Sequence, residues 1–430
     1  MSAPLLTNYV FQMKSLDLDV INFNDTLSVR AFPKILLSDS ILDFYPQAEI
    51  YVRDKQGILS EKLFMVEGLQ IETKLGREKD ENVVEAADKL DGYLVNQYAW
   101  INHNINQTEI KNQISGDYIF LLVPIPYIKD SPDTLAYNDT ISNIVKKVIT
   151  DSKAFGYQLT NSMGEKKVFI GDTTALKTVW YQAGRYTRFF LESLASRAIS
   201  LSPPYANSPY YTFLNNKGEF YFMSAAEMLS QPPIAEYRIE ENMNSPKDPY
   251  VVKSYTIQSG GALINKVNYK KRFHTVKSDG TVVFEDNDIS NQKQTINGTF
   301  PSNKDKLLIL KNKTLKISQN ITSIDNFGLY DDEDSNIYKG WKNNFYKNGV
   351  LPYRMELEIF FNPKLCAGKT ITLQVSKMLE NEYASEFTGA WLIMTSSSYM
   401  DIEGVPIQRL LIGKSGIAID STHPCANFFI

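Results

Sequence analysis

Residues 210–222 read YYTFLNNKGEFYF, two aromatic runs on either side of Asn215-Asn216-Lys217-Gly218. Aromatic residues favour strands, whereas asparagine and glycine adopt the positive φ angles that tight turns require. The stretch therefore predicts a β-hairpin with strands at 210–214 and 219–222. No other part of the chain gives as clear a supersecondary signal.

The residues in front of this hairpin have the periodicity of a helix between residues 172 and 198. An N-cap is available at Asp172 or at the two threonines that follow it, and Ser202-Pro203-Pro204 ends the pattern because proline has no backbone donor. Gly184 lies inside the pattern, at a point where the helix can be interrupted. The apolar stripe consists of Leu176, Val179, Trp180, Ala183, Phe190, Leu194 and Ala198.

A second helix is predicted from residue 139 to residue 149. Asn138 and Asp139 offer an N-cap in front of the first apolar residue, and Gly156 follows the last one. The apolar residues have the i, i+3, i+4, i+7, i+8 spacing of one helix face. They are Ile141, Ile144, Val145, Val148 and Ile149.

Much of the remaining chain alternates apolar and polar residues, which is the pattern of half-buried strands. Residues 77–91 are charged and favour a solvated loop or a surface helix. Residues 285–345 are rich in Asn, Asp, Lys and Ser and predict long loops or an irregular insertion. The segments predicted as strands are 16–20, 49–52, 62–68, 354–359, 370–375 and 389–394.

The composition of the 430 residues is typical of a β-rich protein with large packed contacts. Tyrosine (25), phenylalanine (23) and tryptophan (4) make up 12% of the chain and favour strands and interfaces. The 45 basic and 49 acidic residues give a formal charge of −4, which argues against a dedicated duplex-DNA binder because such a protein needs a basic face. The length corresponds to two to four domains.

Cysteine and histidine are too sparse for a disulfide framework or a clustered zinc site. The two cysteines, Cys366 and Cys425, lie far apart, and no two of the three histidines lie within four residues of each other. We therefore expect a reducing compartment, no metal and no cofactor. The amino terminus lacks the pattern of a signal peptide, and the apolar run Tyr118–Ile128 is too short to span a membrane.

Two glycine-lysine motifs match known site motifs only in part. Gly368-Lys369-Thr370 ends like a phosphate-binding loop, but Pro363 stands where that motif requires glycine, and strand residues follow. Gly413-Lys414-Ser415-Gly416 lacks the spacing of a nucleophile elbow and predicts a turn after a strand. We expect no nucleotide and no catalytic serine at either motif.

Acidic residues gather at two places in the C-terminal half. Asp331-Asp332-Glu333-Asp334 favours a solvated loop, with a bound cation as the alternative, because Asn336 stands where an EF-hand loop has glycine. Glu356 and Glu358 share one face of a strand, which can seat the two carboxylates of a glycosidase but is more often the polar face of a half-buried strand. We therefore assign no catalytic, cofactor-binding or metal-ligating residue.

The order of these segments resembles that of the baseplate hub proteins of phage tails and of related contractile injection machines, including the VgrG-type spikes. In that family a helix of the type FL..LA.RA precedes an aromatic strand, a glycine turn and a second strand of the type F.F, as residues 189–198 precede residues 210–222 here. The resemblance extends from about residue 10 to residue 415. The other matching segments are 51–57 with 64–68, 139–149, 231–237, 367–373, 388–393 and 408–412.

The resemblance implies a mainly β fold with two tail-tube-like β-barrel domains, an inserted α+β domain and irregular polar loops. Residues 1–125 would form the first barrel domain and residues 126–235 the insert. Residues 236–345 would be a β-rich segment with a long polar insertion. Residues 346–430 would supply the closing strands of the second barrel domain and a C-terminal tail.

The resemblance also implies a structural function without catalysis. Three copies of such a hub present six tube-like domains, so the homotrimer joins a sixfold tail tube to a threefold central spike and forms part of the DNA ejection channel. Expected partners are the central spike protein and tail tube or tube-initiator proteins, with the tape measure protein and the baseplate wedge as further candidates. DNA would be present only in transit, and the slight negative charge suits such a passage. The expected location is the tail baseplate of the virion, after assembly in the host cytoplasm.

Two other functional classes stay open. One is a tail-tip protein with cell-wall hydrolase activity, for which Glu356 is the residue to test. The other is a receptor- or glycan-binding tail protein, in which exposed aromatic rings would stack on sugars.

Overall fold

The structural statements that follow concern the residues that the computed structural model describes. The expectations for residues 16–20, 62–68, 78–91 and 331–334 lie outside them. The described residues are 9–15, 34–54, 70–77, 92–110, 113–151, 155, 167–174, 178–201, 208–240, 248, 250–260, 275–276, 282–284, 293–298, 315–320, 328–330, 351, 353–375, 387–400 and 406–414.

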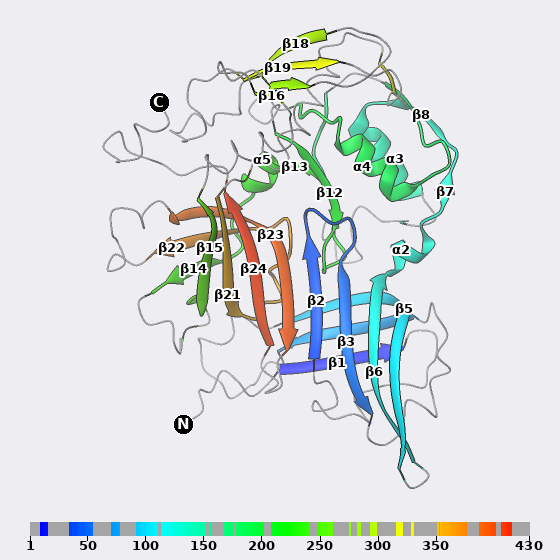
Figure 1. Cartoon of the computed structure of the whole chain (residues 1–430), viewed down its shortest axis with the longest axis vertical. Coiled ribbons are helices and arrows are strands. Elements are labelled where there is room, and N and C mark those ends of the chain that lie inside the picture. The colour runs from blue at the N-terminus through cyan, green and yellow to red at the C-terminus, as the bar shows by residue number, and fades with distance from the viewer. Residues whose placement is uncertain are drawn as a thin grey trace.

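The fold is mainly β, as predicted, and is organised around one twelve-stranded sheet (Figure 1). The N-terminal half of this sheet contains, in spatial order, β1 (Tyr9–Ser15), β4 (Gln70–Arg77), β5 (Gly92–Ile110), β6 (Gln113–Pro124), β3 (Gln47–Asp54) and β2 (Lys34–Ser40). The C-terminal half continues with β23 (Gly389–Met400), β24 (Pro406–Lys414), β21 (Tyr353–Phe360) and β15 (Ser254–Gly260), while β22 (Thr370–Val375) and β14 (Glu236–Ile239) branch from β23.

The two halves join where β2 pairs antiparallel with β23, from Ile35 opposite Met400 to Ser40 opposite Thr395. The N-terminal part of β23 pairs instead with β22, and a register shift against β24 lies between Ile393 and Thr395. Such a shift bends a strand, which allows β23 to serve both neighbours. Among the described strands the pairings form an open path from β1 to β15, and no closed barrel is seen. β1 crosses behind β2 and β3 (Figure 1).

The C-terminal half confirms the strands predicted at 354–359, 370–375 and 389–394. Burial alternates along most of β21 because every second side chain faces the core. The other side of the alternation carries polar residues, as the sequence pattern predicted. The buried core of this half includes Tyr237, Leu357, Ile359, Ile371, Leu373, Trp391, Ile393, Leu410 and Ile412.

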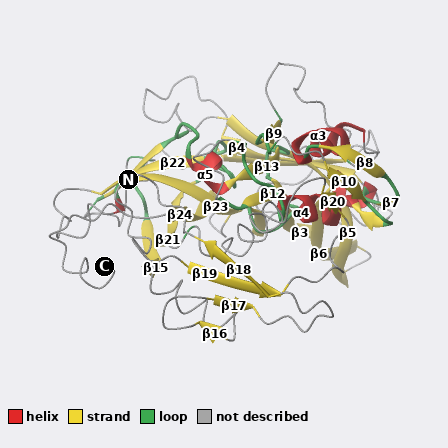
Figure 2. Cartoon of the chain, turned by 90° about the horizontal axis from the view of Figure 1, so that it is seen from above, coloured by secondary structure: helices red, strands yellow, loops and turns green. Residues whose placement is uncertain are grey.

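The segment between β6 and β14 forms the α+β part of the fold. The predicted hairpin is confirmed as β12 and β13, and the predicted helix at 139–149 is confirmed as α3, whose five stripe residues are all buried. Figure 2 shows α3 and α4 close together, and α5 near β22 and β23. The elements are α2 (Ile125–Lys129), β7 (Pro132–Asp133), β8 (Ala136–Asp139), α3 (Ile141–Asp151), β9 (Val168–Ile170), β10 (Thr178–Tyr181), β11 (Arg185–Tyr186), α4 (Thr187–Ala195), β12 (Tyr210–Leu214), β13 (Phe220–Ser224) and α5 (Ala225–Leu229).

The helix predicted between residues 172 and 198 is wrong in its first half. Residues 178–181 form β10, which pairs with β8 on one side and with β20 on the other. The chain then turns through Ala183 and Gly184, both at positive φ, and α4 begins only at Thr187. Strand pairing on both sides therefore outweighs the helical periodicity of the apolar residues. The predicted cap residue Thr173 forms a bridge with Ser200 instead.

The polar segment 285–345 is not entirely made of loops, so that prediction is wrong at three places. It contains β18 (Lys293–Gly298), β19 (Leu315–Asn320) and β20 (Gly328–Tyr330). With β16 (Thr275–Val276) and β17 (Val282–Phe284), the first two form a separate four-stranded sheet. The third pairs with β10.

The apolar run Tyr118–Ile128 is divided between β6 and α2. None of the described helices is long and apolar enough to cross a membrane. The domain division at residues 125, 235 and 345 stays a prediction.

Candidate functional site

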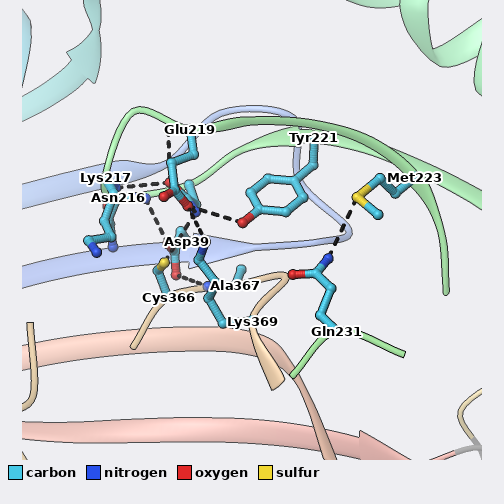
Figure 3. A network of polar contacts seen from close by, with 11 residues as sticks. Asp39, Asn216, Lys217, Glu219, Tyr221, Met223, Gln231, Cys366, Ala367 and Lys369 are labelled. Atoms are coloured by element: carbon cyan, nitrogen blue, oxygen red, sulfur yellow. Dashed lines mark hydrogen bonds and ion pairs between the residues drawn. The ribbon is translucent and has the colours of Figure 1, made fainter. Parts of the chain in front are cut away.

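Buried polar side chains gather where three parts of the chain meet (Figure 3). These parts are the end of β2, the turn between β12 and β13, and the loop that leads from β21 into β22. We call this group the junction. Its residues are Asp39, Asn215, Asn216, Glu219, Tyr221, Cys366, Ala367, Gly368 and Lys369.

Asp39 connects all three parts through its carboxylate. Its Oδ2 accepts a hydrogen bond from the backbone N–H of Asn216 at 2.7 Å, and its Oδ1 accepts one from the N–H of Ala367 at 3.2 Å. Burial raises the pKa of Asp39 to about 7, although these backbone donors act in the opposite direction. The carboxyl thus holds two distant loops against the end of β2.

Asn215 shapes the turn of the hairpin. Its Oδ1 accepts from the backbone N–H groups of Lys217 and Glu219, both at 3.0 Å, and Gly218 adopts a φ of 67°. Its Nδ2 donates to Glu219 Oε2 at 2.8 Å and to Cys366 Sγ at 3.1 Å. The turn predicted from asparagine and glycine is confirmed, and Gly218 takes the expected positive φ. Asn215 does not; it stabilises the turn through the hydrogen bonds of its side chain.

Glu219 and Lys369 form an ion pair at 2.9 Å, with side chains only 14% and 13% exposed. The Tyr221 hydroxyl also donates to Glu219, at 3.0 Å. Burial alone would raise the pKa of Glu219, but Lys369 and the hydrogen bonds to the carboxylate bring it below its usual value. The Lys369 ammonium lies 4.6 Å from the ring centre of Phe169 and 5.6 Å from that of Tyr221.

Gly368 allows the third loop to approach the hairpin. Its φ is 84°, and a Cβ at this position would lie 2.7 Å from Cζ of Phe213. The Phe213 ring stacks on Tyr221, with centroids 4.9 Å apart and planes inclined by 2°. Only glycine fits both the backbone angle and the close approach.

The junction also explains the partial phosphate-loop motif. Lys369 is engaged by Glu219, and the Thr370 hydroxyl donates to the carbonyl of Met228 at 2.9 Å. β22 begins at Thr370, so a strand follows the motif as the sequence predicted. These residues connect the closing strands to the hairpin.

Glu356 and Glu358, the two candidate glycosidase carboxylates, both accept hydrogen bonds from side chains on other strands of the sheet. Glu356 accepts from Gln258 at 2.8 Å. Glu358 accepts from Arg409 Nε and from the Tyr399 hydroxyl, both at 3.2 Å. Both side chains are half-buried in the alternating pattern of β21, which is what the polar face of a strand requires.

Within the described part of the chain, no group of three histidine, cysteine, aspartate or glutamate residues could hold a metal ion. Asp331–Asp334 and His274 lie outside that part. Cys366 is buried, and burial raises the pKa of its thiol well above the usual value, so the thiol is held in its neutral form.

The sequence did not single out Asp39, Glu219 or Cys366. One signal for Asp39 was present, because it occupies the inward-facing register of β2 together with the buried residues Ile35 and Leu37, and the buried Ile41 follows the strand. A carboxylate inside an apolar alternation implies a buried hydrogen-bond partner. Which backbone groups would supply that partner depends on loops 177 and 328 residues away along the chain.

Solved structures with the same fold exist although no protein-family model and no curated protein sequence matches the chain. A tail protein from Neisseria meningitidis aligns with 96% of this chain and 98% of its own, at a TM-score of 0.51 and 9% identity. The 43 kDa tail protein of prophage MuSo2 from Shewanella oneidensis aligns with 94% and 98%, at a TM-score of 0.51 and 10% identity. The chain has the fold of a phage tail protein.

This phage tail fold confirms the resemblance predicted from the sequence, and it does so over nearly the whole chain. The E. coli c3393 protein, described as a component of the type VI secretion system, aligns with 93% of this chain at a TM-score of 0.46 and 9% identity. At such identities the likeness concerns the phage tail fold and not the function of any one relative.

Proposed function

We propose that the chain is a structural baseplate hub of a phage tail. In this proposal it is a homotrimer that joins the sixfold tail tube to the threefold central spike and forms part of the DNA ejection channel. It acts by binding its neighbours and not by catalysis, and it resides in the virion tail after assembly in the host cytoplasm.

The observation that carries the proposal is the division of the large sheet. Six strands from the N-terminal part and six from the C-terminal part meet edge to edge at β2 and β23. If each half acts as one tube-like domain, three copies present six such domains. That count matches a sixfold tube on one face and a threefold spike on the other. It is consistent with residues 1–125 as the first tube-like domain and with residues 346–430 as the closing strands of the second, to which β14 and β15 add two strands from residues 236–345.

The junction supports the same proposal. A hub has to transmit force between tube and spike without separating its halves. Asp39 fixes the end of β2 to the hairpin and to the loop before β22, so the two halves and the insert are held by buried polar contacts as well as by strand pairing. A cluster of buried apolar residues lies around these contacts: Ile41, Tyr211, Phe213, Tyr221, Ala225, Met228, Leu351, Ala367, Leu392 and Met394.

The test is the molar mass of the purified full chain, alone and mixed with the spike and tube proteins of the same tail, measured by light scattering. We expect three copies per particle, either alone or in the presence of those partners. A chain that stays monomeric under all these conditions would contradict the proposal.

A cell-wall hydrolase is the alternative function to be tested. The full chain and the Glu356→Gln variant are compared in a cell-wall lysis assay, and we expect no lysis from either. Lysis by the wild type that disappears in the variant would overturn the structural assignment.

A further inference from the structure

Aromatic side chains gather around one arginine on the surface of the α+β segment, close to where α2 leads out of β6 (Figure 1). Tyr127, Tyr186 and Phe189 are 38%, 45% and 46% exposed. The Arg188 guanidinium carbon lies 4.5 Å from the ring centre of Phe189 and 5.4 Å from that of Tyr127. Tyr186 contacts Phe189 edge to face, with centroids 6.3 Å apart. We call these four residues the aromatic patch.

The buried carboxylate of Asp130 fixes the backbone that carries the patch. Asp130 accepts hydrogen bonds from the backbone N–H groups of Thr187 at 2.8 Å and Arg188 at 3.3 Å, and from the Tyr45 hydroxyl at 3.3 Å. Tyr45 in turn packs edge to face against Tyr127, with centroids 5.3 Å apart. The start of α4 and the end of α2 are therefore fixed to each other, and the four side chains are positioned before any partner arrives.

The Arg188 side chain has hydrogen-bond donors that are not used within the described residues. Its Nε is buried, and within the described residues it has no hydrogen-bond partner. No ion pair of its guanidinium occurs among those residues either. The Asp130 carboxylate, which accepts from the backbone N–H of Arg188, is already used by two backbone donors and a hydroxyl. A guanidinium has five N–H donors, and the four on the two terminal nitrogens of Arg188 also form no hydrogen bond within the described residues. These four donors, and not the buried Nε, are the ones that a partner can reach.

We propose that the aromatic patch is a docking surface for a segment of another protein that presents a carboxylate between apolar side chains. The carboxylate pairs with the planar guanidinium, whose fork matches a carboxylate in two parallel hydrogen bonds. The apolar side chains cover the exposed faces of Tyr127, Tyr186 and Phe189. Tyrosine and arginine are the residue types that contribute most of the affinity at such interfaces.

Charge distinguishes this partner from a nucleic acid. A phosphate backbone requires a row of cations along its path. Here the neighbouring side chains include Asp133, which lies opposite Arg185 in the pairing of β7 with β11. Among the four residues of the patch Arg188 is the one cation, and it lies against aromatic rings, which corresponds to one carboxylate and not to a chain of phosphates.

This inference goes beyond the hub assignment and does not depend on it, because binding to the patch can be measured on the chain whatever its oligomeric state. The probe is a fluorescein-labelled peptide in which leucine and aspartate alternate, compared by fluorescence polarisation with the same peptide carrying asparagine in place of aspartate. We expect the full chain to bind the acidic peptide at least about tenfold more tightly than its asparagine counterpart.

Three variants locate the binding. Arg188→Gln should bring the two peptides to equal affinity, whereas Lys129→Gln, which removes an exposed cation from α2, should preserve the preference. Phe189→Ala, at an exposed position, should weaken both peptides to the same extent and keep the preference. Thermal unfolding of each variant serves to confirm that it is folded.

Four results would overturn the proposal. They are no measurable binding of the acidic peptide, equal binding of both peptides by the wild type, a preference that survives Arg188→Gln, and affinities that Phe189→Ala leaves unchanged. Binding of oligodeoxythymidine or of a chitin oligosaccharide that is lost in Arg188→Gln would assign the patch to a different class of ligand.

Discussion

The junction and the aromatic patch use the same chemistry in opposite ways. In the junction the Lys369 ammonium lies 4.6 Å from the ring of Phe169, and in the patch the Arg188 guanidinium lies 4.5 Å from the ring of Phe189. Lys369 also has Glu219 at 2.9 Å, and both of these side chains are at least 86% buried. Arg188 has no such partner among the described residues, and Phe189 is 46% exposed.

A cation stacked on an aromatic ring therefore does not by itself indicate whether it stabilises the fold or binds a partner. Where a carboxylate of the same chain forms an ion pair with the cation, the contact holds elements of the fold together. Where the carboxylate is lacking and the rings are exposed, the same arrangement is available to another protein.

Lys369→Met should destabilise the protein by about 3–5 kcal/mol, because it leaves the buried Glu219 carboxylate without its cation. The double variant Lys369→Met with Glu219→Gln should recover part of that loss, since no buried charge is then unpaired. Urea denaturation measures both. If Lys369→Met is as stable as the wild type, the ion pair between Glu219 and Lys369 does not stabilise the fold.

Gly368→Ala should destabilise by about 2–4 kcal/mol, because alanine is strained at a φ of 84° and its Cβ would meet Phe213. The matched control is Gly218→Ala, where φ is 67° and no atom lies within 4 Å of the added Cβ. We expect about 1 kcal/mol there, from backbone strain alone. Equal losses at the two positions would show that the contact with Phe213 has no energetic weight.

The Asp39 carboxyl should make the junction weaker at high pH. Its pKa is raised by burial to about 7, so the folded protein binds this proton more tightly than the unfolded chain does. The contribution of the group to stability is therefore present near pH 4 and is lost as the pH rises toward 7. The urea concentration at the midpoint of denaturation should decrease from pH 5 to pH 7 and change little above pH 7.

Asp39→Asn should flatten this pH dependence, at a lower overall stability because an amide has one acceptor for two backbone donors. Glu219 does not interfere, because its pKa lies below its usual value and it stays ionised across this range. A variant with the same pH dependence as the wild type would show that another group titrates.

Arg188→Met should change stability by less than about 0.5 kcal/mol, because the guanidinium completes no ion pair among the described residues and the surrounding rings are exposed. It is the counterpart of Lys369→Met in the same denaturation assay. A loss comparable to that of Lys369→Met would mean that Arg188 holds the fold together and is not free for a partner.

The local sequence pattern predicted the elements that depend only on residues close together in the chain. Asn215 and Gly218 made the hairpin predictable, and the stripe from Ile141 to Ile149 made α3 predictable, because turn chemistry and helical spacing are properties of neighbouring residues. β10 was missed because Val179 and Trp180 fit a helical stripe equally well. Only pairing with β8 and β20 decides between the two.

The candidate site depended on contacts that no short window of sequence contains. Asp39 receives hydrogen bonds from residues 216 and 367, and Glu219 pairs with Lys369. The sequence argued against a phosphate loop at Gly368-Lys369-Thr370, because Pro363 stands where the motif requires glycine. It could not show what the lysine contacts. The aromatic count indicated a protein with large contacts, but not which rings would be exposed.

The central claim is that three copies of the chain form a hub with six tube-like domains. Electron microscopy of the purified full chain, with its tube and spike partners where they are needed for assembly, tests it most directly. We expect particle classes with threefold symmetry, six peripheral lobes and a central opening. Particles of a single copy, or rings of another symmetry, would contradict it.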